Sequence, residues 1–246
     1  MPWSVVAALT ADVSQVHATT RLIVAVDGPA GAGKGAVCRA VANRFDLAYL
    51  ETGTIYRAVG LLALRQGWTD PDTVAAAAAT MNFTFRRVET DTYRAFLDDE
   101  DVTAALRQEE VGIAASWYAA LPQVRSALLA FQRQYGAPAA AILDGRDVGT
   151  VVHPNAALKI FLTASLDVRA KRRFQELQQA GEAVSFQGIL AQMAERDARD
   201  SGRTHGPLVP AVDAVRIDTT HLTLEESIDR VVELVGKALS QPACTG

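Results

Sequence analysis

The sequence predicts an α/β fold in which a parallel sheet carries helices on both faces. Three patterns indicate it: short apolar runs without polar alternation, a glycine-rich turn directly after the first run, and helix-type spacing between the runs. Continuous apolar runs are typical of strands that are covered on both faces, as in parallel sheets. The chain of 246 residues is long enough for one or two domains.

The first apolar run leads into the glycine-rich turn and then into a helical pattern, which is the opening of a nucleotide-binding α/β fold. Three more apolar runs follow later in the chain, and each is followed by a polar or charged segment. The last helix has Thr223 as N-cap and Glu226 three residues later, which form a capping box. The predicted core elements are strands at 22–26, 139–143, 158–162 and 214–217, and helices at 36–44, from near Asp167, and at 223–239.

The middle of the chain differs in kind, because two of its segments alternate between apolar and polar residues. Such alternation predicts half-buried antiparallel strands, here at 82–88 and 92–97. Helical patterns flank them at 56–65, 109–120 and 124–133, and Pro122 and Pro138 mark boundaries. We therefore expect an extension over 1–20, a core over 21–53 and 135–246, and an inserted subdomain over 54–134.

Composition excludes several classes of function. Lys and Arg total 24 and Asp and Glu total 28, so the net charge is −4 and provides no basic field for nucleic acid or for a membrane surface. Only two cysteines are present, Cys38 and Cys244, and they lie far apart. These features favour a cytoplasmic enzyme or binding protein, and we take a monomer as the default.

The strongest single motif is G-x-x-x-x-G-K between the first strand and the first helix. Glycines allow successive backbone N–H groups to surround phosphate oxygens, and the start of the helix adds a favourable dipole. The lysine brings a positive charge to the transferred phosphate. The motif in this context predicts a binding loop for a nucleoside triphosphate such as ATP. The residues expected to bind it are Gly28, Pro29, Ala30, Gly31, Ala32, Gly33, Lys34, Gly35 and Ala36.

One position departs from the usual pattern. The motif commonly continues with Ser or Thr, whose hydroxyl coordinates Mg²⁺. Here Lys34 is followed by Gly35 and Ala36, which have no such group. We expect Mg²⁺ to be held by water and nucleotide phosphates, with Asp144 as a further contact through water; the alternative is reduced activity.

Several arginines lie where a second anion could be bound. Arg57 follows the first helix, and Arg146 follows a core strand at the end where ligands bind in open α/β sheets. Arg196, Arg199 and Arg203 are spaced by three and four residues and so share one helical face. Guanidinium groups suit bidentate phosphate binding, so this set indicates a phosphorylated acceptor.

With these residues the chain resembles the bacterial cytidylate kinases, which phosphorylate CMP with ATP. The resemblance covers residues 22–235 and rests on the segments GPAGAGKGA, YLETGTIYRAVG, LRQEEVGIAAS, PQVRSALLAFQR, LDGRDVGTVVHPNAALKIFLTAS and ERDARDSGR. It implies a P-loop kinase core, a subdomain that binds the nucleoside monophosphate, and a helical lid over about 164–205. It also implies CMP, and dCMP, as acceptors.

The resemblance implies a role for each matching residue. Thr52, Arg125 and Asp147 contact the cytosine, whose exocyclic amine is a donor that suits a carboxylate. Ser116, Arg196 and Asp200 hold the sugar. The groups implied in catalysis are Lys34, Arg57, Arg146 and Arg203, and the last three bind the acceptor phosphate and the migrating group.

Other interpretations of these residues stay open at this point. Asp147 could cap a helix or pair with Arg146, and the charges over 195–200 are also typical of a solvated helix face. The basic run 169–173 is expected to be the exposed side of the lid, offset by Glu176 and Glu182, with Arg173 and Arg199 as possible lid arginines. Two alternative functions are a kinase for another small acceptor, such as UMP or a non-nucleotide metabolite, and a catalytically weak nucleotide-binding regulator.

Overall fold

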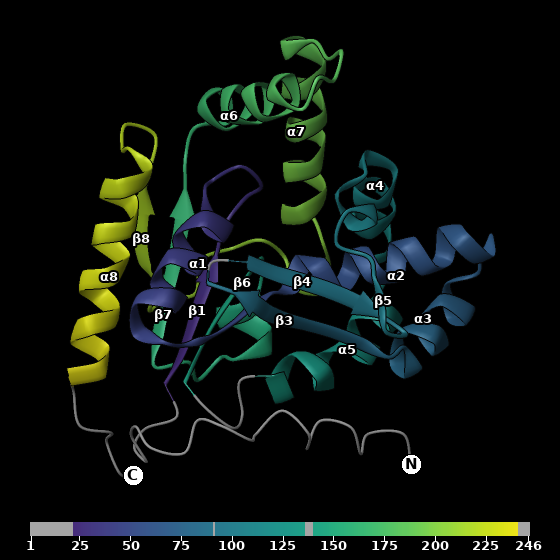
Figure 1. Ribbon diagram of the computed structural model, residues 1–246, viewed down its shortest axis with the longest axis horizontal. Helices are drawn as coiled ribbons and strands as arrows, with labels where there is room; N and C mark the ends of the chain where they lie inside the picture. The colour runs from purple at the N-terminus through teal and green to yellow at the C-terminus, as the bar shows by residue number, and fades with distance from the viewer. Residues whose placement is uncertain (1–21, 91, 136–139, 241–246) are drawn as a thin grey trace.

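The computed structural model describes residues 22–90, 92–135 and 140–240 (Figure 1). Within these ranges the main sheet is parallel and has five strands in the order β2-β6-β1-β7-β8. Asp27 on β1 is paired in register with Gly145 on β6, so these two strands end level with each other. The strands are β1 (Ile23–Asp27), β2 (Ala48–Glu51), β6 (Ala141–Gly145), β7 (Leu158–Thr163) and β8 (Val215–Asp218).

Burial of the central strand confirms that the sheet is covered on both faces. Val24, Ala25 and Val26 are consecutive, so their side chains point to opposite faces, and all are fully buried. Helix α1 (Lys34–Phe45) packs against α8 (Leu224–Ser240) and against β6, while the short turn η3 (Val148–Val152) packs against β1 and β6. The capping box at the start of α8 is confirmed, because Thr223 and Glu226 exchange hydrogen bonds.

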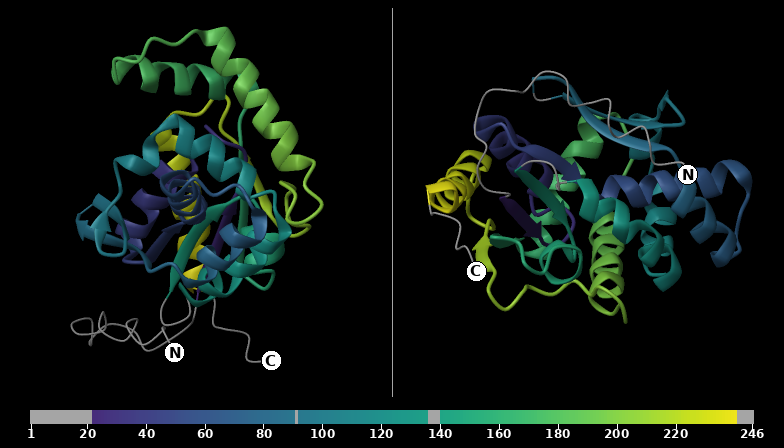
Figure 2. Two further views of the ribbon diagram at one scale, coloured as in Figure 1. Left: turned by 90° about the vertical axis from the view of Figure 1, so that its right-hand side faces the viewer. Right: turned by 90° about the horizontal axis from the view of Figure 1, so that it is seen from below.

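The middle of the chain forms a second group of elements beside the main sheet (Figure 2). Its small sheet is antiparallel with the order β3-β4-β5, as the alternating segments predict. Phe83 and Phe85 supply its buried face. The elements of this group are α2 (Thr52–Gln66), α3 (Pro71–Thr80), β3 (Phe83–Glu89), β4 (Thr92–Leu97), β5 (Glu100–Asp101), η2 (Ala105–Arg107), α4 (Glu109–Tyr118) and α5 (Pro122–Tyr135).

Two helices, α6 (Leu166–Gln179) and α7 (Phe186–Ser201), form an arm that stands above the main sheet (Figures 1 and 2). Ser165 and Ser185 cap their first turns by accepting from the N–H groups of Val168 and Gly188. The arm has an apolar cluster of its own, centred on Ala170, Ile189 and Met193, separate from the main core. None of the described helices is long and apolar enough to span a bilayer.

Several predicted boundaries shift in the structure. The predicted helix 36–44 begins at Lys34, and the predicted helix 56–65 begins at Thr52. Strand β2 is not detectable as an apolar run, because its four residues include Glu51. Residues 1–20, Pro138 and the first residue of the predicted strand 139–143 lie outside the described ranges.

Candidate active site

The glycine-rich loop connects the end of β1 to the start of α1 and has the backbone that a phosphate cradle requires. Gly31 and Gly33 have φ angles of 74° and 93°, which favour glycine. A Cβ at Gly28 would overlap the backbone oxygen of Leu162 on β7, so only glycine allows this close approach. No side chain of Gly33 can cap α1, and the first N–H groups of the helix are therefore available to an anion.

Lys34 lies folded against this loop. Its Nζ donates to the carbonyl oxygens of Gly28 and Pro29, both at 2.8 Å. Burial and repulsion by Arg146 lower the pKa of Lys34, whereas the neighbouring carboxyl of Asp144 opposes that shift. The amino group of Lys34, the first residue of α1, therefore lies against the loop, in a site where a second anion would stabilise its charge.

Two side chains from other elements fix the carbonyl groups of the loop. Arg169 donates from Nη1 to Ala30 O at 3.1 Å and from Nη2 to Asp197 Oδ2 at 2.6 Å. The hydroxyl of Thr219 lies 3.3 Å from Ala32 O and 3.1 Å from Thr163 O, so its single proton is shared between these two carbonyl oxygens. The expectation that the whole run 169–173 is exposed is therefore wrong for Arg169, which is 5% exposed. A run of charged residues is usually predicted to be exposed to solvent. The sequence does not show that the guanidinium of Arg169 contacts the carbonyl group of a distant residue.

Asp144 on β6 is a buried carboxyl beside the loop. The hydroxyl of Tyr49 donates to Asp144 Oδ2 at 3.3 Å. Burial and the negative charge of Glu51 raise the pKa of Asp144, although Lys34 and Arg146 act in the other direction. Two neighbouring carboxyl groups of this kind fit a divalent cation, whose charge would offset their repulsion. The described residues contain no cluster of three or more metal-ligating side chains, so a cation here would depend on nucleotide oxygens and water.

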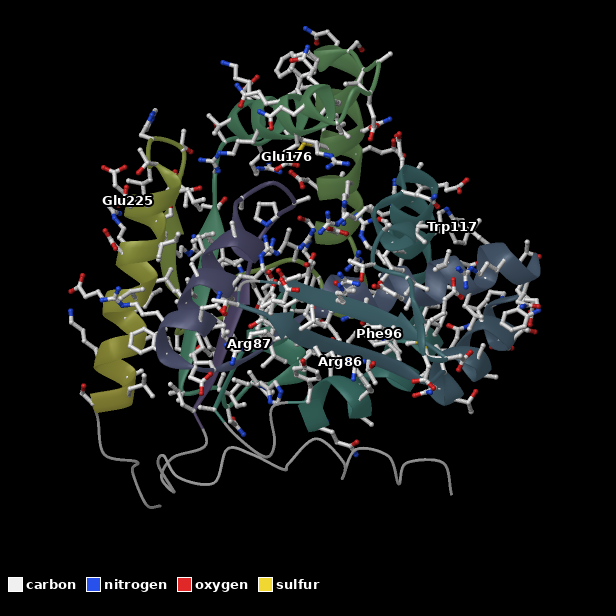
Figure 3. The ribbon with its side chains drawn as sticks, in the orientation of Figure 1. Arg86, Arg87, Phe96, Trp117, Glu176 and Glu225 are labelled. Carbon is white, nitrogen blue, oxygen red and sulfur yellow. The ribbon has the colours of Figure 1, made fainter. Side chains whose placement is uncertain are left out.

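Asp200 on α7 holds two of the predicted arginines. Arg146 Nε donates to Asp200 Oδ2 at 2.9 Å, and Arg203 Nη2 forms an ion pair with Asp200 Oδ1. Burial alone would raise the pKa of Asp200, but these two guanidinium groups lower it below its usual value. Figure 3 shows side-chain nitrogen atoms gathered between α7 and the upper edge of the main sheet. By contrast, Arg86 and Phe96 lie on the small sheet, where the guanidinium covers the ring at 4.5 Å.

Arg196 and Arg57 complete a group of mutually repelling cations. Burial and repulsion by Arg146 lower the pKa of Arg196 to about 10, and its buried Nε has no partner among the described residues. Arg57 donates to Leu106 O at 2.6 Å; its pKa is lowered by burial and by nearby arginines, although Glu51 opposes the shift. Partly buried guanidinium groups that repel one another create a site that favours a phosphate.

Asp147 forms a buried ion pair with Arg125, rather than with Arg146. Arg125 also donates to Ala119 O at 3.2 Å, and its guanidinium lies 5.6 Å from the centre of the Tyr56 ring. The structure therefore decides against the alternative pairing with Arg146, because that guanidinium is turned toward Asp200. The pair places a carboxylate and a guanidinium near the end of β6. Together they can accept hydrogen bonds from the polar edge of a ring and donate hydrogen bonds to it.

Thr52 and Ser116 are both buried and both hydrogen-bonded. Thr52 Oγ1 donates to the backbone oxygen of Asp144 at 2.8 Å, and Ser116 Oγ accepts from Arg199 Nη1 at 2.9 Å. Arg199 thus contacts a predicted site residue. A further contact between Gln192 Nε2 and Glu109 Oε1, at 3.1 Å, joins the same helices α7 and α4. The arm therefore lies against the helix that carries Ser116.

The predicted residues converge from segments far apart in the chain: the loop, the start of α2, α4, α5, the end of β6, and α7. Two buried charged residues that contact this region, Asp27 and Arg169, are absent from the predicted set. The signal for Asp27 is its place directly before the glycine-rich loop at the end of an apolar run. For Arg169 the only feature visible in the sequence is that it belongs to the basic run 169–173.

Comparison with known proteins agrees with this geometry. The family model described as cytidylate kinase matches residues 24–237. A cytidylate kinase from Magnetococcus marinus is 55% identical over 222 residues, which is 90% of this chain and 99% of that protein. Those of Marinomonas sp. and Vibrio cholerae are 42% and 43% identical, each over 88% of this chain and over 96% and 97% of their own lengths.

Proposed function

The chain belongs to the cytidylate kinase family, and from this membership and the geometry of the cleft we propose how it transfers a phosphoryl group from ATP to CMP. The observation that carries the proposal is the buried pair of Asp147 and Arg125 beside Arg146, level with the end of β1 where the phosphate-binding loop starts. We further propose dCMP as an acceptor, a nucleoside monophosphate subdomain over 54–134 and a lid over about 164–205. Membership does not favour the two alternative functions.

The donor side is formed by the phosphate-binding loop. Backbone N–H groups at 28–36 would bind the β- and γ-phosphates of ATP, and Lys34 would exchange the carbonyl oxygens of Gly28 and Pro29 for phosphate oxygens. Arg169 and Thr219 hold Ala30 and Ala32, so the loop keeps its shape during this exchange. The preformed backbone supports tight positioning of the γ-phosphoryl group.

Mg²⁺ fits the same side of the cleft. Asp144 would hold it through water, with Glu51 close by, and Ala36 provides no hydroxyl ligand. When bound, the ion neutralises charge that develops on the phosphate oxygens. We propose that the enzyme requires Mg²⁺, because the buried carboxyl of Asp144 and the partly buried carboxyl of Glu51 repel each other.

The acceptor phosphate would bind to Arg57, Arg146 and Arg203. Asp200 fixes two of these guanidinium groups, while Arg57 and Arg196 lie in a site that disfavours their own positive charge. Binding of an anionic phosphate would relieve this repulsion. The same arginines would stabilise the charge on the migrating group in the transition state, where such contacts contribute most to rate.

Base selection is assigned to Asp147, Arg125 and Thr52. Asp147 would accept a hydrogen bond from the exocyclic amine of cytosine, whereas uracil presents an oxygen acceptor at that position. Arg125 holds the carboxylate in place from α5. Ser116, Arg196 and Asp200 are proposed to contact the sugar, and Arg199 keeps the Ser116 hydroxyl oriented.

Transfer is proposed to be direct and in line. The nucleophile is a phosphate oxygen of CMP that is already anionic at neutral pH, so no general base is needed and no covalent intermediate forms. Contacts of α7 with α4 close the cleft over the acceptor and exclude water. Exclusion of water limits the hydrolysis of ATP.

The test is a coupled assay of ADP release with CMP, dCMP, UMP and AMP as acceptors. We expect the highest kcat/KM for CMP, with dCMP close to it. A preference for UMP or AMP would remove the proposed role of Asp147, and ATP binding without turnover would contradict the kinase assignment. We also propose a monomer in the cytoplasm, where both substrates occur; light scattering on the purified chain checks the first point.

A further inference from the structure

Asp27 is a buried carboxylate that none of the proposed roles uses. It is the last residue of β1 and is 3% exposed. Its Oδ1 accepts from the backbone N–H of Val148, and its Oδ2 accepts from that of Gly149, both at 2.7 Å. The two oxygens therefore bind two consecutive N–H groups on a segment more than a hundred residues away in the chain.

The two ends of this contact belong to the donor side and the acceptor side of the proposed active site. In sequence Asp27 is followed directly by Gly28, the first residue of the phosphate-binding loop. Val148 and Gly149 directly follow Arg146 and Asp147. Because Asp27 also pairs in register with Gly145, the carboxylate spans from the end of one strand to the turn that leaves its neighbour.

The turn held by Asp27 has backbone N–H groups that no other described contact satisfies. In η3, the N–H groups of Val151 and Val152 bind to Asp147 O, and that of His153 binds to Val148 O. The N–H groups of Val148 and Gly149 precede this pattern and bind to Asp27 instead. Space is tight as well, since a Cβ at Gly149 would lie 3.3 Å from Asp27 Oδ2 and 3.3 Å from the Lys159 side chain.

A buried carboxylate at this place is costly, which argues that it does more than fill space. Burial disfavours its charge, and the charge of Asp147 adds to that effect, while the two backbone N–H groups and Lys34 act against it. An apolar residue would cover this position of β1 at lower cost, as Val24 and Val26 do. A carboxylate, however, has two acceptor oxygens and can bind the N–H groups of Val148 and Gly149 at the same time.

We propose that Asp27 is a positioning residue that holds Arg146 and Asp147 at a fixed separation from the phosphate-binding loop, and so aligns the donor phosphate with the acceptor. The inference rests on the proposed roles of Arg146 and Asp147. It adds a residue that contacts neither substrate and acts through the backbone. A misplacement of about 1 Å can reduce the rate about 100-fold, so a small shift of this segment is sufficient to be measured.

Asp27→Asn tests the proposal, because the amide keeps the shape but turns one acceptor into a donor that faces an N–H group. We expect kcat/KM for CMP to fall about 10- to 100-fold, with a higher KM for CMP and weaker discrimination between CMP and UMP. The dissociation constant for ATP, measured by calorimetry without acceptor, should not change. The matched control is Asp70→Asn, which removes a carboxylate from the N–H of Thr73 at the start of α3, away from the cleft.

Unaltered kcat/KM and KM for CMP in Asp27→Asn would overturn the proposal. An equal loss of ATP binding and CMP binding would also overturn it, because it would indicate a purely structural role. If Asp27→Asn does not fold, Asp27→Glu keeps both acceptors but moves them by one methylene; the same split between ATP and CMP is then expected. Turnover of CMP by the wild-type protein is measured first. Its failure would refute the proposed function, whereas CMP binding by the variants still decides the role of Asp27.

Discussion

Arg146, at the end of β6, is joined to Asp200, on α7, by a hydrogen bond of 2.9 Å from Nε to Oδ2. The bond connects the main sheet to the arm formed by α6 and α7. It also turns the guanidinium away from Asp147 and toward Arg203 and Arg196, where the proposed acceptor phosphate binds. The Asp200 carboxylate and the carbonyl oxygen of Gly145, which accepts from Arg146 Nη1 at 3.2 Å, together fix the orientation of Arg146.

Loss of this arginine should reduce turnover far more than it reduces stability. In Arg146→Ala we expect kcat to fall by about 10³- to 10⁵-fold, since a transition-state arginine has that effect in comparable transfers. Steady-state assays with saturating ATP and CMP measure it. Arg87→Ala is the control, because Arg87 forms only an exposed ion pair with Asp46. A comparable loss in both variants would contradict the role of Arg146.

Asp147→Ala should mainly relax base selection. The variant loses a hydrogen bond to a charged group, so we expect the preference for CMP over UMP in kcat/KM to fall about 10- to 100-fold. Arg125 is left buried and unpaired, and a lower melting temperature should accompany the change. Competition between the two nucleotides in one assay gives the ratio directly. An unchanged ratio would refute the assignment.

Placing a hydroxyl group at position 36, directly after the loop, tests whether Ala36 weakens the binding of Mg²⁺. The side chain of Ala36 is partly exposed at the first turn of α1, next to the proposed position of the metal. In Ala36→Thr we expect half-maximal activity at a lower Mg²⁺ concentration, because the hydroxyl adds an oxygen ligand. Activity is titrated against Mg²⁺ at fixed ATP. Identical titration curves would mean that water and phosphate oxygens already suffice.

Arg169→Ala should act on the donor side of the cleft. The change removes the contact with Ala30 O and leaves Asp197 without its guanidinium. We therefore expect the KM for ATP to rise more than the KM for CMP. Lys171→Ala, a change two residues further along on the exposed surface, should leave both constants unaltered. A rise confined to CMP would show that the loop does not depend on Arg169.

The pH dependence of the unfolding free energy should reveal the raised pKa of Asp27. Burial and repulsion by Asp147 raise its pKa from 3.8 to about 6, against the effect of the N–H groups of Gly149 and Val148 and of Lys34. The folded chain therefore binds a proton more tightly than the unfolded chain. The contribution of Asp27 to the unfolding free energy should fall by up to about 3 kcal/mol as pH rises from about 4 to 6.

Urea titrations of the wild type and of Asp27→Asn at several pH values measure this effect as a difference. The contributions of most other ionisable groups cancel in that difference, although the charges of Asp147 and Lys34 act on Asp27. The advantage of the wild type should be greatest below pH 4 and should decline toward pH 6. A difference that stays constant with pH would show that Asp27 has the same pKa in both states.

How far sequence predicts such a site depends on the range of the interactions involved. The strand, glycine turn and helix around Lys34 are local, and their chemistry is fixed by neighbouring residues, so the loop was predictable. The position of Arg146 was predictable too, because ligands bind at the carboxyl ends of parallel strands. The choice of Arg125 rather than Arg146 as the partner of Asp147 depends on packing between α5 and η3, which no local pattern encodes.

Residues that act through the backbone are the hardest to predict. Asp27 and Arg169 bind N–H and carbonyl groups of segments remote in sequence, and these groups are the same in every residue. Side-chain composition therefore gives no indication of these backbone partners, and the side-chain partner of Arg169, Asp197, lies 28 residues away in the chain. The roles of the matching residues came from resemblance to a family, whereas the positions of these two came only from the folded chain.

The separate apolar cluster of α6 and α7 has a mechanical consequence. Because Ala170, Ile189 and Met193 pack with their own neighbours, we expect the proposed lid, helices α6 and α7, to move as one body without opening the main core. Contacts between these helices and the rest of the described chain include those from Arg146 to Asp200, from Arg199 to Ser116 and from Arg169 to Ala30. All three are polar, and water can replace each of them. We therefore expect release of a product to require the exchange of polar contacts only, while the interior of the molecule stays packed.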